Sequence, residues 1–391
     1  MIDNQILHIY QDSLLIKSVV KELCKSQNLQ LKGLAGSADS FIVAGLSSMV
    51  KNLHVIILHD KEEAAYFFND LRSLIEEESL LFFPGSYKKA YQFEETENAN
   101  VLQRAEVLNR INGQDFSNGI VVTYPDALFE KVINKKSLTE NTFKASVADK
   151  LDVDFLTELL IEYGFEKSDF VYEPGQFAVR GGIIDIFSFS SDLPFRMELF
   201  GDEVESIRTF DPESQVSIKQ RKTINIIPNV QESLLEESRQ SIFEYIPEDA
   251  LIWFKDFRET TDLIEKGYQK AKESFDEIMK VSGSTQVVFE PDDLFDSEKS
   301  FTSLIQSFKK IEFGKRFYLK SDKTFEFRIK PQPTFHKKFD ILCQDLRVYQ
   351  DKLYKKFIAS ESAGQLERLE TIFSEIDQEV KFNGLVAGLR E

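Results

Sequence analysis

The chain has 391 residues, a formal net charge of −18 and a pI near 4.9, in a composition typical of globular proteins. This length predicts two or three domains, and the acidity argues against strong DNA binding by the chain as a whole. Residues 1–17 lack the basic and apolar regions of a signal peptide, and no apolar run approaches the roughly 18 residues of a membrane helix. The two cysteines, Cys24 and Cys343, form no disulfide framework. We therefore expect a cytosolic protein with no membrane contact.

Short apolar runs alternate with helix-like stretches in the first part of the chain. We expect strands at residues 55–58, 80–83 and 119–123, and helices at 61–74, 94–111 and 125–132. Buried strands separated by helices indicate a parallel sheet.

The pattern changes in the middle and then returns. A helix at 152–163 and alternating strands at 177–179, 183–187, 195–200 and 204–210 predict a small antiparallel α+β domain. Later come strands at 250–254 and 285–289 and helices at 259–276 and 365–373, with a helix-then-strand candidate at 339–357. The predicted fold class is α/β: a parallel-sheet, P-loop-like domain (1–135 and 229–391) split by an inserted α+β domain (136–228). The two outer parts would share one sheet.

Residues 31–43 resemble a phosphate-binding loop that has lost its chemistry. Gly33 takes the first glycine position of Gly-x-x-x-x-Gly-Lys-Ser/Thr, and Ser40 keeps the hydroxyl. Ala38 replaces the second glycine and Asp39 replaces the lysine, so a carboxylate would repel the phosphates. The alternative is that Gly33 and Gly36 only shape a tight loop. Both interpretations predict that no nucleotide binds.

No catalytic, metal or cofactor site is predicted. The four histidines show no ligand spacing, and no nucleophile arrangement can be proposed from motifs. His54 and His59 flank a buried strand and are expected to be structural. The histidines are His8, His54, His59 and His336.

The middle domain contains a candidate interaction surface. In the strand 195–200, Arg196, Glu198 and Phe200 alternate with Met197 and Leu199, which are expected in the core. Arginine and aromatic residues are enriched at interface hot spots. The alternative is that the arginines are paired, with Glu198 and Glu205 as partners, and that the helix 152–163 buries Phe200.

Two further arginines belong to the same candidate surface. Arg180 would end a neighbouring strand before Gly181 and Gly182, which we expect to mark a bulge. Arg208, on the next strand, is a weaker candidate. Charge reversal of Arg196 is expected to cost little stability, with Arg104 on the helix 94–111 as a neutral control.

Three stretches of the sequence resemble a known family. Residues 172–187 (YEPGQFAVRGGIIDIF) and 193–211 (LPFRMELFGDEVESIRTFD) are similar to an insert shared by the excinuclease protein UvrB and bacterial transcription-repair coupling factors, and residues 83–97 (FPGSYKKAYQFEETE) match the coupling-factor version. Where UvrB has a strand ending Asp-Glu-Ser-His, this chain has Lys255, Asp256, Phe257 and Arg258. The broken phosphate loop favours the amino-terminal, UvrB-like part of a coupling factor.

The resemblance implies a degenerate RecA-like domain and a function without catalysis. It implies that the chain is an adaptor that binds UvrA, the excinuclease protein that acts together with UvrB. The complete family protein would be an ATP-dependent DNA translocase that binds double-stranded DNA and RNA polymerase, with its carboxy-terminal domain docking intramolecularly; no motor motif occurs here. The alternative is a UvrB-like ATP-dependent enzyme that binds damaged DNA. The implied UvrA-binding residues are Arg180, Arg196, Phe200 and Arg208, and the implied non-functional nucleotide site comprises Gly33, Ala38, Asp39, Ser40, Lys255 and Asp256.

Overall fold

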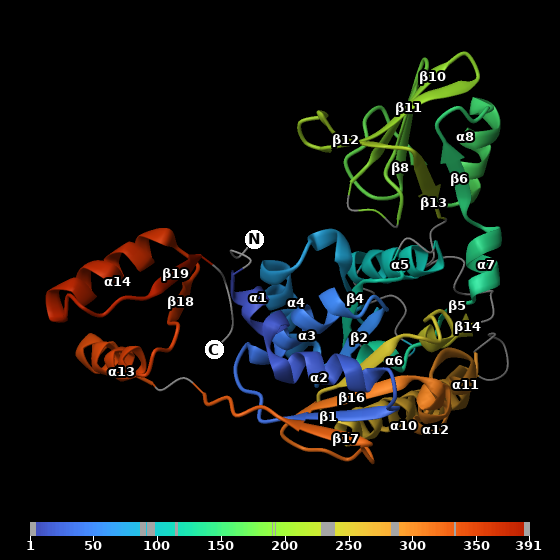
Figure 1. The fold of residues 1–391 in the computed structure, drawn as a ribbon. Helices are drawn as coiled ribbons and strands as arrows, with labels where there is room; N and C mark the ends of the chain where they lie inside the picture. The colour runs from blue at the N-terminus through green and yellow to red at the C-terminus, as the bar shows by residue number, and fades with distance from the viewer. Residues whose placement is uncertain are drawn as a thin grey trace.

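The computed structural model describes residues 5–86, 91, 98–113, 116–189, 191, 193–227, 239–282, 289–331 and 334–386. Its centre is a seven-stranded sheet in the order β17-β1-β16-β15-β2-β4-β3, and every neighbouring pair is parallel (Figure 1). Four strands precede the inserted domain and three follow it, so the two outer parts share one sheet as predicted. The strands are β1 (Asn28–Lys32), β2 (His54–Ile57), β3 (Leu80–Phe82), β4 (Ile120–Thr123), β15 (Leu251–Phe254), β16 (Lys309–Gly314) and β17 (Lys323–Glu326).

Helices enclose this sheet because its central strands are apolar on both sides. Every residue of β2, β4 and β15 is buried, as expected for strands covered on both faces. The predicted α/β class is thus confirmed. The helices are α1 (Gln5–Asp12), α2 (Leu14–Leu23), α3 (Ala38–Met49), α4 (Lys61–Leu74), α5 (Asn98–Asn112), α6 (Pro125–Leu128), α7 (Lys135–Glu140), α10 (Phe257–Ser282), α11 (Pro291–Leu294) and α12 (Glu298–Leu304), with short 3-10 turns at Glu77–Ser79, Ile242–Glu244 and Ile305–Ser307.

Some predicted elements differ in length. The helix expected at 125–132 ends at Leu128, because the chain then enters the short strand β5 (Val132–Ile133), which pairs with β14 (Arg239–Gln240). The strand expected at 285–289 and most of the motif at 83–97 lie outside the described residues. No helix in the described part is long and apolar enough to cross a membrane.

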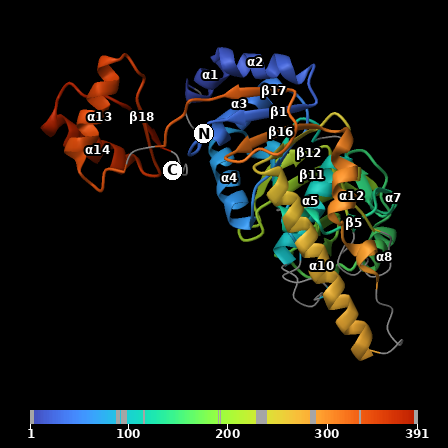
Figure 2. The same cartoon turned by 90° about the horizontal axis from the view of Figure 1, so that it is seen from below.

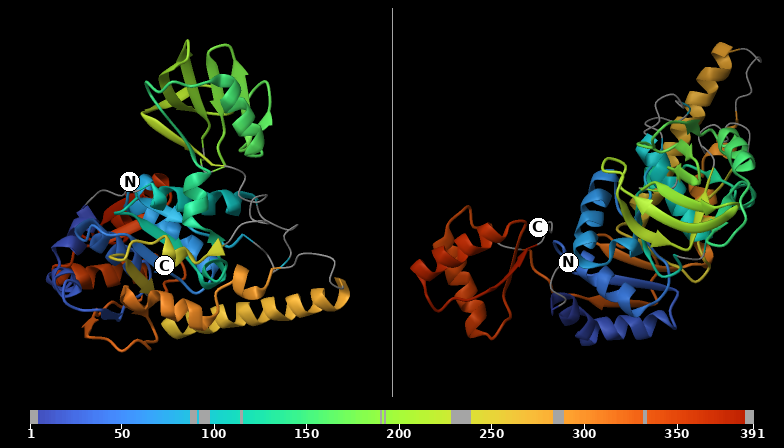
Figure 3. Two further views of the ribbon diagram at one scale, coloured as in Figure 1. Left: turned by 90° about the vertical axis from the view of Figure 1, so that its right-hand side faces the viewer. Right: turned by 90° about the horizontal axis from the view of Figure 1, so that it is seen from above.

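The inserted domain is built on a six-stranded sheet in the order β12-β11-β10-β9-β8-β7, antiparallel except for β7 and β8. One face of this sheet packs on α8 (Val153–Glu162) around Phe177, Met197 and Ile207. The segments that enter and leave the domain pair with each other as β6 (Phe143–Ser146) and β13 (Thr223–Ile226), and Figure 3 shows the domain standing away from the α/β body. The strands are β7 (Glu166–Lys167), β8 (Gln176–Arg180), β9 (Ile183–Ile186), β10 (Phe195–Phe200), β11 (Glu203–Phe210) and β12 (Ser217–Arg221).

The last described segment forms a small unit with its own core. It contains α13 (Phe339–Asp351), β18 (Phe357–Ser360), α14 (Ala363–Ile376) and β19 (Asn383–Val386), and among the described residues its two strands form a sheet of their own. Cys343, Phe373 and Val380 form a separate buried cluster there. The unit lies to one side of the α/β body (Figures 1 and 2). The predicted domain boundaries stay a prediction.

Candidate functional site

The degenerate phosphate loop lies between strand β1 and helix α3, where a phosphate-binding loop would lie. Gly33 directly follows β1 with φ +78°, and a Cβ there would lie 1.9 Å from the carbonyl oxygen of Phe327. A side chain at residue 33 would therefore be strained both by its backbone angle and by the neighbouring chain. The packing of Phe327 explains Gly33 without any nucleotide.

Asp39 and Lys255, two members of the predicted non-functional nucleotide site, meet in one ion pair. Lys255 Nζ, directly after β15, lies 2.5 Å from Asp39 Oδ2 at the start of α3, and the two side chains are 16% and 3% exposed. The Ser40 hydroxyl donates to Asp70 Oδ2 at 2.9 Å and is buried. The charges of Asp39 and Lys255, at the positions where the resemblance predicted a lysine and a metal ligand, thus neutralise each other. The sequence predicted both changes but not their contact.

Asp256, the second residue after β15, has a structural role. It is buried, it accepts a hydrogen bond from the backbone N–H of Glu259 at 2.9 Å, and it pairs with Arg316 Nε at 2.8 Å. Asp256 therefore caps the first turn of α10.

His59 lies near the Asp39–Lys255 pair, in a cluster with Glu63, Asp256 and Glu259 that the spacing of the histidines in the sequence did not reveal. The Nδ1 atom of His59 is 2.7 Å from Glu63. One ring nitrogen of His59 and one carboxylate oxygen each of Asp256 and Glu259, which are atoms that could bind a metal ion, lie within 4.8 Å of one another. The hydrogen bond to Glu63 raises the pKa of His59; burial raises the pKa of Glu63, but His59 and the nearby Lys255 outweigh it and bring that pKa to about 2. Arg316 contacts both Asp256 and Glu259 and already supplies the cation that these carboxylates require.

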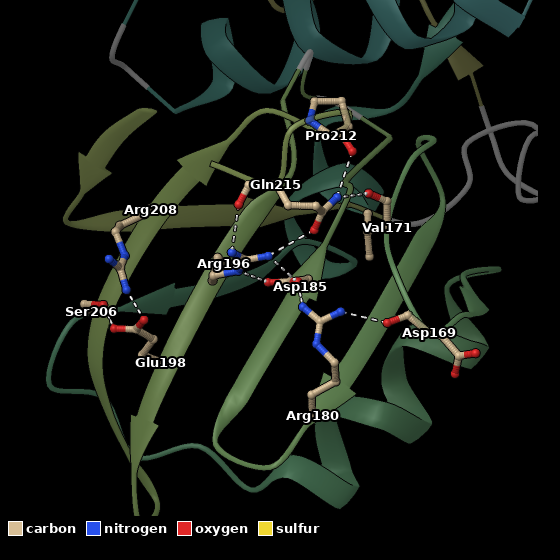
Figure 4. A network of polar contacts seen from close by, with 10 residues as sticks. All are labelled: Asp169, Val171, Arg180, Asp185, Arg196, Glu198, Ser206, Arg208, Pro212 and Gln215. Carbon is tan, nitrogen blue, oxygen red and sulfur yellow. Dashed lines mark hydrogen bonds and ion pairs between the residues drawn. The ribbon is translucent and has the colours of Figure 1, made fainter. Parts of the chain in front are cut away.

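The three candidate arginines, Arg180, Arg196 and Arg208, gather on the face of the inserted sheet opposite α8 (Figure 4). We call this the arginine face, formed by Arg180, Asp185, Arg196, Glu198 and Arg208. Its register is set by strand pairing: Arg196 on β10 lies opposite Asp185 on β9 and opposite Arg208 on β11. Cross-strand neighbours on one face are close enough to interact. The alternation predicted for β10 therefore places these side chains together.

A buried carboxylate that sequence reasoning missed orders this face. The side chain of Asp185 is 0% exposed and accepts from Arg196 Nε at 2.7 Å, from Arg196 Nη2 at 2.9 Å, and from Arg180. Arg196 also donates to the backbone oxygen and side chain of Gln215, each at 3.2 Å. Hydrogen bonding to Asp185 raises the pKa of Arg196. Arg180 and Arg196 are therefore fixed in orientation from within the sheet.

This pairing overturns one expectation. Arg196 was expected to be solvent-exposed and cheap to reverse, but its side chain is only 16% exposed and its partner is buried. Reversing Arg196 would place a second carboxylate beside the buried Asp185 and leave only Arg180 to balance the two. Breaking a buried ion pair typically costs about 3–5 kcal/mol, so the reversal should reduce stability clearly. The alternative that the arginines are paired is confirmed: Glu198 pairs with Arg208 as expected, while Arg180 and Arg196 share Asp185, a partner that this alternative did not name.

The glycines after Arg180 form a turn. The expectation of a bulge is wrong: Gly181 and Gly182 are the two-residue turn of the β8–β9 hairpin, with Gly181 at φ +60°. A Cβ on Gly182 would lie 2.9 Å from the carbonyl oxygen of Leu199, whose N–H donates to Gly182. The register shift occurs instead between β10 and β11, after Glu198.

Phe200 projects from the tip of the β10–β11 hairpin. Its side chain is 81% exposed, and the backbone turns at Gly201 (φ +67°) before pairing Phe200 with Glu203. The alternative that the helix 152–163 buries this ring is therefore wrong. α8 covers the opposite face of the sheet.

Arg104 is unsuitable as a neutral control. It is buried, it donates to the carbonyl oxygens of Pro84, Ala127 and Glu130, and it stacks over Phe83 at 4.2 Å. These contacts join α5 to the segment after β3 and to α6 with the residues that follow it, so replacing Arg104 would affect stability.

A basic segment runs through the end of the α/β body. Residues 309–338 contain ten Lys and Arg against three Asp and Glu, in a chain whose net charge is −18. Exposed members include Lys320, Lys323, Arg328 and Lys330, on and around the edge strand β17. This local excess of positive charge can be counted in the sequence, but the net charge of the whole chain does not reveal it.

Comparisons with known proteins agree with this organisation. Residues 143–231 match the family model described as the UvrB interaction domain. The transcription-repair-coupling factor of Bacillus subtilis is 32% identical over 59% of this chain and 20% of its own length, and that of Myxococcus xanthus is 30% identical over 56% and 19%. The UvrABC system protein B of Thermosipho africanus is 28% identical over 61% and 38%. This chain thus spans about a fifth of the coupling factors that it matches.

Proposed function

We propose, from the homology of this chain to the amino-terminal, UvrB-like region of transcription-repair coupling factors, that it is a non-catalytic adaptor that binds UvrA. The inserted domain would supply the contact through the arginine face and Phe200. In a complete coupling factor this contact would bring UvrA to RNA polymerase stalled at a DNA lesion. The ATP-dependent translocase motor would lie elsewhere in that protein.

The exposure of Phe200 supports the binding half of this proposal most directly. An aromatic ring that is 81% exposed gains free energy when a partner covers it. The neighbouring arginines are already held by Asp185 and Glu198, so little side-chain entropy is lost when a partner binds. An exposed ring beside ordered arginines has the composition of an interface hot spot.

The Asp39–Lys255 pair supports the non-catalytic half. A nucleotide would have to displace a lysine from a carboxylate that is 3% exposed and then place its phosphates beside that carboxylate. Both steps are unfavourable, because the charge at residue 39 has the wrong sign. This argues against the alternative of a UvrB-like ATP-dependent enzyme.

The binding half is tested by calorimetric titration of purified UvrA with the parent chain and with Phe200→Ala. We expect Phe200→Ala to weaken binding at least tenfold, about 1.4 kcal/mol, with an unchanged melting temperature. Phe155→Ala is the matched control, because Phe155 is 56% exposed on α8, on the other side of the same domain. A parent chain that does not bind UvrA, or a Phe200→Ala variant that binds like the parent, would refute the proposal.

The non-catalytic half is tested by thermal melting with millimolar ATP and magnesium. A ligand that binds only the native state must raise the melting temperature by mass action. We therefore expect the same melting temperature with and without ATP and magnesium. A magnesium-dependent rise that disappears in Ser40→Ala would show a working nucleotide site. Release of phosphate from ATP by the purified chain would contradict the proposal equally.

A further inference from the structure

The loop of residues 168–175, between β7 and β8, borders the arginine face. Figure 4 shows Asp169 and Val171 of this loop beside the arginine network. Arg180 Nη1 donates to the backbone oxygen of Asp169 at 2.7 Å, and Gln215, which contacts Arg196, donates to that of Val171 at 3.3 Å. The loop is therefore attached to the two arginines that Asp185 orients.

Local hydrogen bonds also fix the backbone of this loop. The side-chain oxygen of Gln176 accepts from the N–H groups of Tyr172 and Glu173 at 2.9 and 3.1 Å, and the Ser168 hydroxyl donates to the oxygen of Phe170 at 2.7 Å. Val171 is fully buried with Ala178, Phe187 and Phe210. Three hydrogen bonds and the burial of Val171 thus hold the backbone of this loop in place.

The two residues that flank Val171 present aromatic rings to solvent. Phe170 and Tyr172 are 49% and 54% exposed, with ring centroids 6.5 Å apart. The guanidinium of Arg180 lies 4.7 Å from the centroid of the Phe170 ring. Exposed rings on a fixed backbone can be covered by a partner with little loss of conformational entropy.

We propose that Phe170 and Tyr172, in the loop between β7 and β8, form a second aromatic contact of the UvrA-binding surface, in addition to Phe200 at the tip of the β10–β11 hairpin. This inference rests on the proposed function and adds residues to it. The arginine face itself carries three arginines and two carboxylates, so its net charge is small and the flanking rings supply the apolar area. The partner surface that fits has an apolar hollow for Phe200, another for the Phe170–Tyr172 pair, and polar acceptors between them.

The test is a calorimetric titration of UvrA with Tyr172→Ala, Tyr172→Phe and Phe170→Ala, each beside its thermal melt. We expect the two alanine variants to bind about tenfold more weakly or worse, as hot-spot truncations do, and Tyr172→Phe, which keeps the ring, to bind like the parent. Phe155→Ala, with nearly the same exposure as Tyr172, should change nothing.

The outcomes separate this inference from the proposed function. If both alanine variants bind like the parent while Phe200→Ala is weakened, the proposed function stands and the second contact is refuted. If the parent does not bind UvrA, both fall together. If Phe170→Ala lowers the melting temperature because Arg180 stacks on that ring, Tyr172→Ala decides, since no contact joins Tyr172 to an arginine among the described residues.

Discussion

Single charged residues, buried beside their partners, define both halves of the proposed function. Asp39 and Lys255 form an ion pair at the proposed non-functional nucleotide site, and Asp185 orders the arginine face. Burying either charge destabilises the fold little only while its partner is present, because a lone buried charge loses its hydration without compensation. Substitutions at these positions therefore test structure before they test binding.

Reversing one charge of the closed nucleotide site should destabilise the chain far more than reversing both. In Lys255→Asp, Asp39 loses its partner and faces a second carboxylate, with Glu63 also near, so we expect a loss of about 3–5 kcal/mol. The double variant Asp39→Lys with Lys255→Asp restores opposite charges and should recover much of this loss. Urea unfolding of the parent, both single variants and the double variant measures the coupling. Additive single and double effects would show that the pair does not interact.

His54 should make stability fall on acidification. Burial lowers the pKa of His54 to about 4, and the Trp253 indole N–H donates to its Nδ1 at 3.2 Å, which suits the neutral ring. Below pH 6.5 the unfolded chain binds this proton but the folded chain does not, so stability is lost as pH falls from 6.5 toward 4.

The magnitude can be measured against a variant without this histidine. Between pH 7 and pH 5 the His54 contribution amounts to about 2 kcal/mol. We expect His54→Gln to be less stable at pH 7 and to lose less stability over this interval than the parent. Denaturant unfolding at both pH values checks this, and equal losses in the two proteins would contradict it. Contributions common to both, such as that of His59, cancel in the comparison.

At the scale of elements, the inserted domain has the features of an independently folding unit. Its core around Phe177, Met197 and Ile207 is separate from that of the α/β body, and β6 and β13 join its two ends. Its contacts with the body include the exposed pair Lys219–Glu78 and the hydrogen bond from Asn225 to Asn109. Exposed pairs of this kind contribute little stability.

We therefore expect residues 136–228 to fold when expressed alone. The excised domain should melt cooperatively and should bind UvrA within a few-fold of the whole chain, since every residue of the proposed surface lies in it. Thermal melting and the UvrA titration check both statements. A domain that folds but does not bind would place part of the contact in the α/β body. A domain that does not fold would show that the neighbouring body is required.

At the scale of the whole molecule, total charge and local charge oppose each other. The net charge of −18 repels phosphates, while residues 309–338 present exposed Lys320, Arg328 and Lys330. We expect weak duplex DNA binding that this segment accounts for. With about three phosphate contacts, affinity should fall on the order of tenfold between 50 and 150 mM salt.

Fluorescence anisotropy with a labelled duplex measures this binding. Replacing Lys320, Arg328 and Lys330 together with alanine should abolish DNA binding. Lys136→Ala, at an exposed lysine of helix α7, should leave it unchanged. Tight binding at physiological salt, or binding unchanged in the triple variant, would place the DNA contact elsewhere.

The sequence by itself determined the features that depend on local pattern. Buried strands such as 55–58 and 250–254 were predictable because their apolar runs are bounded by polar residues and turns. Local sequence pattern also predicted that an α+β domain is inserted between two α/β parts. It predicted the strand face that carries Phe200 and the negative charge at residue 39 as well. The strands β1 (NLQLK), β16 (KKIEFG) and β17 (KTFE) were missed because polar residues interrupt their apolar ones, which leaves no continuous apolar run.

Only the tertiary structure decided which distant residues became partners. Asp39 and Lys255 are separated by 216 positions and meet because β1 and β15 lie two places apart in one parallel sheet. Asp185 reaches Arg196 through the register of β9 and β10, which no periodicity specifies. Burial then turned these charges into structural pairs, because a charge taken out of water needs a counter-charge within contact distance. Alternation along a strand can predict which face a side chain shares, but not which charge lies beside it there.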